Sequence, residues 1–353
     1  MVPTAPTPAS GPADAPWWID GHLDLAYLDQ VGPRIAQEAP DRAVRGISLP
    51  ALARGRVRIF LGTIFTELGE EAAAQPWGYR DHDDLEGAHA AGARQLAIYH
   101  GLERAGALRI VRTRADLEAC AGAAPDAPPG LVILMEGADP IRTPEEAAWW
   151  FERGVRVVGM TWARGSRYAG GNGTGGPLTA MGRALAQHFD ALGILHDASH
   201  LSRAAFDGLC AATASRIVAT HSNAQALLDP SERHLTDAQA CAIAVRDGVI
   251  GLALYQKFLA SGRPSTVEDA LAHVGHYATL VGRDRLVLGS DFDGGFTPAE
   301  APTGCQRPEE LGSLAQGLAR RGWSAGEIAG FAHGNWMRVL RAALPERAPT
   351  TAA

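Results

Sequence analysis

The chain of 353 residues has very little lysine and few cysteines. Lys257 is the single lysine, so every other basic residue is an arginine. Four cysteines are scattered without a C-x-x-C pair, at Cys120, Cys210, Cys241 and Cys305; we expect them to be reduced and mostly buried, with no disulfide framework. A net charge of −7 leaves no basic footprint for nucleic acid. No run of about 18 apolar residues exists to cross a membrane, so we expect a cytoplasmic protein.

The two ends of the chain differ from the rest in composition. Residues 1–16 are rich in Pro, Ala and Thr and lack the basic and apolar regions of a secretory signal. We expect a disordered tail there and a second one at residues 347–353. The length of residues 17–346 suits one α/β barrel with insertions, so a single metallohydrolase domain is predicted over that range.

Apolar, β-branched runs alternate with helical periodicity along the chain. Strands are predicted at residues 18–25, 57–66, 130–139, 155–162, 194–200, 216–222, 249–255 and 285–294. Helices are predicted at residues 83–106, 144–153, 178–192, 202–212, 235–246, 267–281, 308–321 and 324–344, and an irregular glycine-rich loop at 163–176. The alternation predicts a parallel sheet, and about eight units predict an α/β fold of the (β/α)8 TIM-barrel type.

Six metal-competent side chains stand at the C-terminal ends of predicted strands. In a TIM-type barrel this end carries the active site. His22 and Asp24 are two positions apart in one strand, so both side chains face the same way and could reach one cation. The six candidates are His22, Asp24, Glu136, His200, His221 and Asp291.

This set suits two metal ions better than one, because a zinc ion takes three or four protein ligands. Glu136 could give one oxygen to each ion, since no lysine lies at a middle strand to supply a carboxylated bridge. Two ions about 3.5 Å apart would hold a hydroxide and polarise a carbonyl group. The pattern therefore predicts hydrolysis of an amide or ester.

Each candidate also has an ordinary structural interpretation. A strand-end histidine is often only hydrogen-bonded within the fold, Asp24 could cap a helix, and Glu136 and Asp291 could be turn residues. The shared position at one end of the barrel favours metal ligands. We expect the other nine histidines to be structural, and the side chain of His196 to fill the barrel interior.

A set of short motifs runs along nearly the whole chain. They include Asp20-Gly21-His22-x-Asp24-Leu25, Glu136-Gly137, Gly176-Pro-Leu-Thr-Ala-Met-Gly182, Asp-x-Ser-His200-Leu-Ser202, Thr220-His221-Ser-Asn-Ala224, Arg233-x-Leu-Thr-Asp237, Gly289-Ser-Asp-Phe-Asp-Gly294 and Gly334-Asn-Trp-Met-Arg-Val-Leu340. In content and order this set resembles the renal (membrane) dipeptidases, the M19 peptidases of the amidohydrolase superfamily.

The resemblance implies a distorted TIM barrel with two zinc ions per chain, and a homodimer is a family-level expectation. It assigns one ion to His22 and Asp24, the other to His200 and His221, and the bridge to Glu136. It also implies that Asp291 is the acid/base and that Arg233 grips the terminal carboxylate of a dipeptide. Trp162 and Tyr255 are further candidates for substrate binding.

The chain departs from the family pattern around the substrate. The family's Leu-Thr-His is Met160-Thr161-Trp162 here, which removes a histidine thought to stabilise the tetrahedral intermediate. The family's Arg-Asn-Leu is Arg233-His234-Leu235. We therefore predict a zinc-dependent dipeptidase, with an amidohydrolase for another small amide, ester or lactone as the alternative. A metal-binding barrel without catalysis is the third interpretation.

Overall fold

In the computed structural model of the protein, the described residues are 16–32 and 34–347. The two predicted tails lie outside this part of the chain, apart from Pro16 and Arg347. No helix within it is long and apolar enough to span a bilayer. All four cysteines are free, and Cys120 and Cys305 are buried while the other two are partly exposed.

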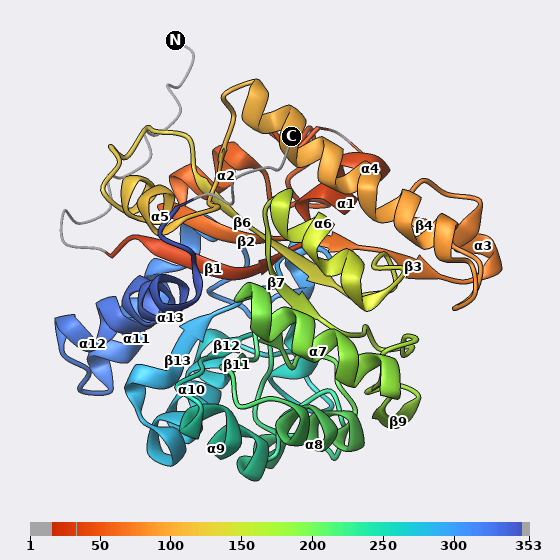
Figure 1. Cartoon of the computed structure of the whole chain (residues 1–353). Helices are drawn as coiled ribbons and strands as arrows, with labels where there is room; N and C mark the ends of the chain where they lie inside the picture. Colours follow the sequence, from red (N-terminus) through yellow and green to blue (C-terminus); the bar gives the residue numbers. More distant parts are fainter. Residues whose placement is uncertain (1–15, 33, 348–353) are drawn as a thin grey trace.

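The centre of the molecule is a ring of eight parallel strands (Figure 1). In spatial order they are β11 (Ile217–Val218), β10 (Leu195–Asp197), β7 (Val155–Gly159), β6 (Gly130–Glu136), β2 (Val57–Phe65), β1 (Trp18–Leu23), β13 (Leu286–Leu288) and β12 (Ile250–Leu252). A parallel bridge between Ala219 and Ile250 joins the two ends of this order. The predicted TIM-type barrel is confirmed, with β5 (Arg109–Ile110) added outside the ring on β6.

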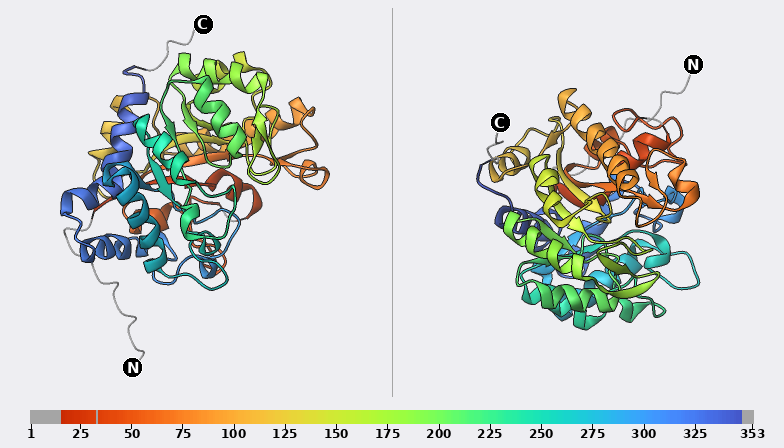
Figure 2. Two further views of the ribbon diagram at one scale, coloured as in Figure 1. Left: turned by 90° about the horizontal axis from the view of Figure 1, so that it is seen from below. Right: turned by 45° about the vertical axis from the view of Figure 1, so that its right-hand side comes forward.

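Helices surround the strands, as Figure 2 shows from two further directions. The principal ones are α2 (Leu49–Arg54), α4 (Leu85–Arg104), α6 (Ala147–Glu152), α7 (Ala180–Leu192), α8 (Arg203–Ala212), α9 (Asp237–Val245), α10 (Val267–Val281), α11 (Gly312–Arg320), α12 (Ala325–Ala329) and α13 (Asn335–Ala343). Local signals fix several of their ends. Thr236 caps α9 through a capping box, and Gly193 ends α7 with a left-handed φ of 75°.

Alternate residues of the strands face two different apolar regions. One set, including Ile19, Val132 and Leu195, lies in the barrel interior with residues of α13. The other set, including Phe60 and Met135, packs against the surrounding helices. This alternation follows from the period of two in a β-strand, and it is interrupted in β1, whose pairing with β2 shifts register between Asp20 and Leu23.

The prediction for His196 is wrong for the same reason. Its neighbour Leu195 faces the interior, so His196 faces the helices. The His196 Nε2 atom lies 2.7 Å from Oδ1 of Asp190 in α7, and its ring is 5.7 Å from that of Phe189. His196 is therefore a buried structural residue outside the barrel.

Other differences concern short elements. The glycine-rich segment predicted to be irregular contains an antiparallel pair, β8 (Ala169–Gly171) and β9 (Gly175–Leu178). Helices α1 (Leu25–Val31) and α5 (Arg114–Ala121) are among those not predicted. Between β2 and α4 lie β3 (Glu67–Leu68), α3 (Glu70–Ala73) and β4 (Gly78–Tyr79), which form a small excursion from the barrel.

Candidate active site

The structure brings the six predicted ligand and catalytic residues together at the C-terminal end of the barrel. His22 lies within β1 and Glu136 ends β6, while the others follow β1, β10, β11 and β13. All six side chains are buried although they are polar: His22, Asp24, Glu136, His200, His221 and Asp291. Burying a polar group without a partner costs free energy. The distances between these six side chains therefore indicate which of them pair with one another.

Glu136 stands at the centre of this cluster, and its two carboxylate oxygens face different histidines. Its Oε2 atom lies 3.6 Å from His22 Nε2. Its Oε1 atom lies 2.9 Å from His200 Nε2 and 3.5 Å from His221 Nε2. The two latter nitrogens are only 3.0 Å apart. One carboxylate thus contacts three imidazoles, and two of these, His22 and His221, lie close together with ring centroids 3.6 Å apart.

His22 also lies close to two further carboxylates, those of Asp24 and Asp291. Possible ligand atoms of His22, Asp24 and Asp291 all lie within 4.8 Å of one another. The His22 Nε2 atom is 3.8 Å from Oδ1 of Asp24. Asp24 occupies the N-cap position of α1, but its side chain makes no capping hydrogen bond. The helix-cap interpretation of Asp24 is therefore wrong, and its Oδ1 instead accepts a hydrogen bond from Thr63.

Hydrogen bonds to the far side of two rings orient them toward the cluster. His200 Nδ1–H donates to Oδ1 of Asn172 over 3.0 Å. His221 Nδ1–H donates to the Thr220 hydroxyl over 2.9 Å, and that hydroxyl donates to Asp197 over 2.6 Å. These bonds leave Nε2 of each ring as a free lone pair, which is the form that binds a metal. Asn172 and Asp197 were not predicted, although Asp197 stands in the Asp-x-Ser-His200 motif.

Two residues of the cluster have backbone conformations that L-amino acids rarely adopt. His200 has a φ of 66° and Asp291 a φ of 59°, both in the left-handed region. Such a conformation costs free energy and persists only where the surrounding fold enforces it. The Asp291 backbone N–H donates to the His22 carbonyl oxygen over 3.2 Å, which ties the turn after β13 to β1.

Burial keeps two of the histidines neutral. Burial and the positive charge of Arg233 together lower the pKa of His200 to about 4. Burial also holds the pKa of His221 well below its usual value, with His22 and Arg233 adding to the effect. Neutral imidazoles are competent ligands at neutral pH.

The other four groups of the cluster are His22 and three carboxylates, and their pKa values are shifted by burial and by one another's charges. Burial lowers the pKa of His22, but the charges of Glu136, Asp24 and Asp291 outweigh it and raise that pKa to about 10. Burial raises the pKa of Glu136, yet His22 and His200 hold it well below its usual range. Burial raises the pKa of Asp24 to about 7 and that of Asp291 to about 6. The cluster attracts positive charge, and a divalent cation fits this demand.

The donor set also fits a metal of the zinc type. Imidazole nitrogens and carboxylate oxygens are hard-to-borderline ligands. Lone pairs of His200 and His221 point at the same space as a Glu136 oxygen, an arrangement that is repulsive without a cation or proton between them. The one lysine, Lys257, is exposed and lies outside this cluster.

A cavity of about 240 Å³ opens over the cluster. The three predicted substrate-binding residues, Trp162, Arg233 and Tyr255, all line it. Arg233 is buried, and its Nη1 donates to the Ser222 hydroxyl over 3.3 Å. Among the described residues its Nε and Nη2 atoms have no hydrogen-bond partner. Arg233 therefore has spare donors for an anionic group in the cavity.

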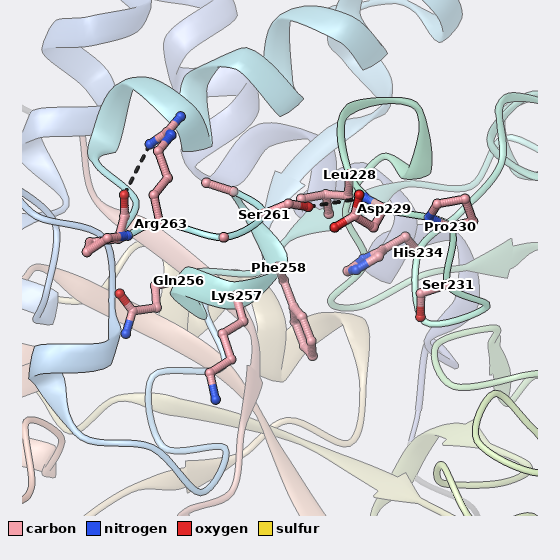
Figure 3. A pocket seen from close by; sticks show the side chains of 13 residues that line it. Leu228, Asp229, Pro230, Ser231, His234, Gln256, Lys257, Phe258, Ser261 and Arg263 are labelled. Atoms are coloured by element: carbon pink, nitrogen blue, oxygen red, sulfur yellow. Dashed lines mark hydrogen bonds between the residues drawn. The ribbon is translucent and has the colours of Figure 1, made fainter.

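A larger cavity of about 700 Å³ lies beside the first and shares Phe258 with it. Figure 3 shows that its lining comes from the segments 228–234 and 256–264. None of the six clustered residues lines it. The chemistry belongs to the smaller cavity, because only there do carboxylates and imidazoles converge.

Comparison with known proteins shows the family of the chain. A family model described as "Membrane dipeptidase (Peptidase family M19)" matches residues 14–352. The chain belongs to peptidase family M19. It is accordingly a hydrolase of the metallopeptidase class. The interpretation as a barrel without catalysis is therefore not retained.

Individual relatives and structures extend this M19 assignment. A protein of Klebsiella pneumoniae, "Uncharacterized protein in pqqA 5'region", is 34% identical over 70% of this chain and 94% of its own length. The dipeptidase aclJ of Aspergillus oryzae is 28% identical over 54% of this chain and 46% of its own length. A metallo peptidase from Rhodobacter sphaeroides, crystallised with a phosphinate mimic of the dipeptide L-Ala-D-Ala, superposes with a TM-score of 0.81 at 26% identity, over 93% of this chain and 99% of that one.

In this M19 chain, Trp162 follows β7 and lies in the cavity wall. Its ring packs edge-on against Phe65, with centroids 5.2 Å apart, and is 6.1 Å from the His200 ring. Tyr255, across the cavity, stacks on Phe296 at 4.7 Å. The substitution at Trp162 thus places an aromatic surface where the family pattern has an imidazole.

Proposed function

We propose that this M19 hydrolase is a binuclear metal-dependent dipeptidase that cleaves the amide bond of a dipeptide. The observation that carries the proposal is the position of Glu136, whose two oxygens face His22 on one side and His200 with His221 on the other. A bridging carboxylate of this kind is what a two-metal site requires.

Zinc is the metal that the donor set favours. One ion would be held by His22 and Asp24, the second by His200 and His221, and both by Glu136. When bound, the two ions supply a water molecule activated at neutral pH and polarise the scissile carbonyl group. The bonds from Asn172 and Thr220 hold the imidazoles ready for this role.

Asp291 is the group placed to move the proton. Its carboxylate lies beside His22 and Asp24 and lines the cavity. There it can take a proton from the attacking water and deliver it to the amine that leaves when the amide bond breaks. Its left-handed backbone fixes the side chain at this place.

Arg233 would bind the carboxylate end of the substrate. Its unpartnered Nε and Nη2 atoms can donate two parallel hydrogen bonds to a carboxylate. The guanidinium carbon lies 4.9 Å from the Phe258 ring centroid, which holds the group in position. The phosphinate dipeptide mimic bound to the Rhodobacter relative supports a substrate of this size.

The proposal is tested with a panel of L,L and L,D dipeptides and zinc-loaded protein, with metal content measured on the same sample. We expect about two zinc ions per chain together with turnover of at least part of the panel. Two zinc ions without any turnover would refute the dipeptide substrate but leave the metal site standing.

A second substrate class has one specific observation in its favour. Trp162 supplies only an indole N–H where the family pattern has an imidazole, so stabilisation of the tetrahedral intermediate of amide cleavage is weakened there. Esters and lactones have better leaving groups, so their hydrolysis depends less on stabilisation of the tetrahedral intermediate. Hydrolysis of such compounds by a protein that leaves every dipeptide intact would establish this alternative.

A further inference from the structure

The active-site cavity has two chemically different sides. Around the ring of eight strands, β2 and β11 are four positions apart in either direction and so stand opposite each other. Arg233 lies in the loop after β11, and Phe65 ends β2. A substrate whose carboxylate is held by Arg233 must direct its other end toward the β2 side. This end carries the residue on the amino-terminal side of the scissile bond.

Aromatic rings form the β2 side. Phe65 packs edge-on against Trp162 at 5.2 Å and against Tyr27 at 5.5 Å, and Tyr27 in turn contacts Trp77 at 5.3 Å. Tyr27, Phe65 and Trp162 line the cavity, and each is only half-buried. Their edge-to-face contacts hold one another in place, so they offer a fixed surface to a ligand.

Glu67 lies next to these rings in β3 and also lines the cavity. Its carboxylate makes no ion pair with any residue in the described part of the chain. Arg164 approaches the same loop, but its Nη1 donates to the Leu68 carbonyl oxygen over 2.8 Å. Burial raises the pKa of Tyr27 and the Glu67 charge raises it further, so the two groups are within electrostatic reach.

The other carboxylates of the cavity have assigned partners. Asp24 and Glu136 would be neutralised by the metal ions, and Asp291 would accept the proton of the attacking water. Among the described residues that line the cavity, Arg233 on the far side is the one basic side chain. Glu67 therefore remains as the carboxylate of this cavity lining that has no assigned partner or role, and it lies beside an aromatic wall.

We propose that Glu67, Tyr27, Phe65 and Trp162 form a subsite for a cationic side chain, that of lysine or arginine, on the amino-terminal residue of the substrate. The inference rests on the proposed dipeptidase function and names its substrate class. An aromatic surface with a carboxylate beside it binds a cation through ring faces and charge together. An apolar side chain of the same length gains only the contact with the rings.

Two dipeptides that differ only in the terminal ammonium test the subsite: lysyl-alanine and norleucyl-alanine, with zinc-loaded protein. We expect kcat/KM to be about tenfold higher for the lysyl substrate in the wild type. In Glu67→Gln this ratio falls toward one, because the charge is lost while the rings remain. In Trp162→Leu the ratio also falls, which provides a second variant. Glu71→Gln, which removes an exposed carboxylate of α3 outside the cavity, keeps the wild-type ratio.

The outcomes separate this inference from the proposed function. Equal kcat/KM for the two substrates in the wild type, or an unchanged ratio in Glu67→Gln, overturns the cationic subsite while dipeptide hydrolysis stands. Proportional loss of both substrates in Glu67→Gln shows that Glu67 binds the α-ammonium common to all dipeptides, and also overturns it. Absence of turnover for every dipeptide refutes the proposed function and the subsite with it.

Discussion

The Nε2 atom of His200 lies 2.9 Å from an oxygen of Glu136. The opposite ring nitrogen, Nδ1, donates to Asn172 over 3.0 Å. His200 thus links the centre of the proposed metal site to an amide in the β8–β9 hairpin loop. The bond from Nδ1 to Asn172 leaves Nε2 of His200 available to a metal. Asn172 should therefore influence metal binding.

Replacement of Asn172 by alanine should weaken the ion held by His200. Loss of the Nδ1–H acceptor frees the ring to change tautomer and to rotate, and such outer partners typically contribute about 10–100-fold in metal affinity. Competition with a chromophoric chelator measures the change. Asn172→Asp keeps an acceptor and should retain most of the affinity. An unchanged zinc affinity in Asn172→Ala would contradict this role.

Asp291→Asn should separate metal binding from catalysis. The amide cannot take up the proton of the attacking water, so we expect kcat to fall by at least about a thousandfold while two metals remain bound. Steady-state kinetics and metal analysis on one preparation provide the measurement. Wild-type turnover in this variant would eliminate Asp291 as the acid/base.

Arg233→Met should affect substrates according to their carboxyl terminus. The change keeps the apolar length of the side chain and removes the charge-assisted bonds, so kcat/KM should fall about a hundredfold for dipeptides with a free carboxylate. C-terminally amidated dipeptides should lose much less. Arg263→Met, at an exposed arginine of the neighbouring cavity that pairs with Asp269, serves as the control. Equal losses for free and amidated substrates would argue against carboxylate binding.

His273 should make the stability of the fold depend on pH. It is fully buried in α10, accepts a hydrogen bond from the Ala224 N–H over 3.1 Å, and donates to the Leu259 carbonyl over 3.3 Å. Burial lowers its pKa to about 4, against about 6.5 in the unfolded chain. The unfolded state binds the proton first as pH falls, so this stabilisation is complete above about pH 6.5 and is lost toward pH 4.

The metal-free wild type should therefore lose about 2 kcal/mol of unfolding free energy relative to His273→Asn when the pH falls from 7.5 to 5. Urea denaturation of both proteins at the two pH values measures this difference. The other buried histidines are present in both proteins, so their contributions to the pH dependence of the unfolding free energy cancel in the comparison. Parallel pH profiles for the wild type and the variant would show that His273 is protonated in the folded state.

The sequence predicted the barrel and the place of the ligands because both follow from local patterns. Buried β-branched runs marked the eight ring strands, and His22, Glu136 and His221 were found because each stands at or near a strand end. The range predicted for α10 is the one observed, residues 267–281. Strand lengths were overestimated, since apolar runs continue past the last ladder bond, as at Leu286–Leu288.

The supporting residues could not be found in this way because they depend on tertiary contacts. Asn172 reaches His200 from a hairpin in a glycine-rich segment whose composition predicts irregular structure. Thr63 meets Asp24 across two strands. His196 was assigned to the barrel interior without asking which face of the strand it occupies, and the alternation with the inward-facing Leu195 would have corrected that prediction.

The most direct test of the account is a titration of metal-free protein with zinc during hydrolysis of a dipeptide that the loaded enzyme cleaves. If Glu136 bridges two ions, activity should rise to a plateau at two equivalents of zinc per chain, and Glu136→Gln should reach neither the plateau nor the stoichiometry. A plateau at one equivalent, or full activity in Glu136→Gln, would contradict the two-metal site.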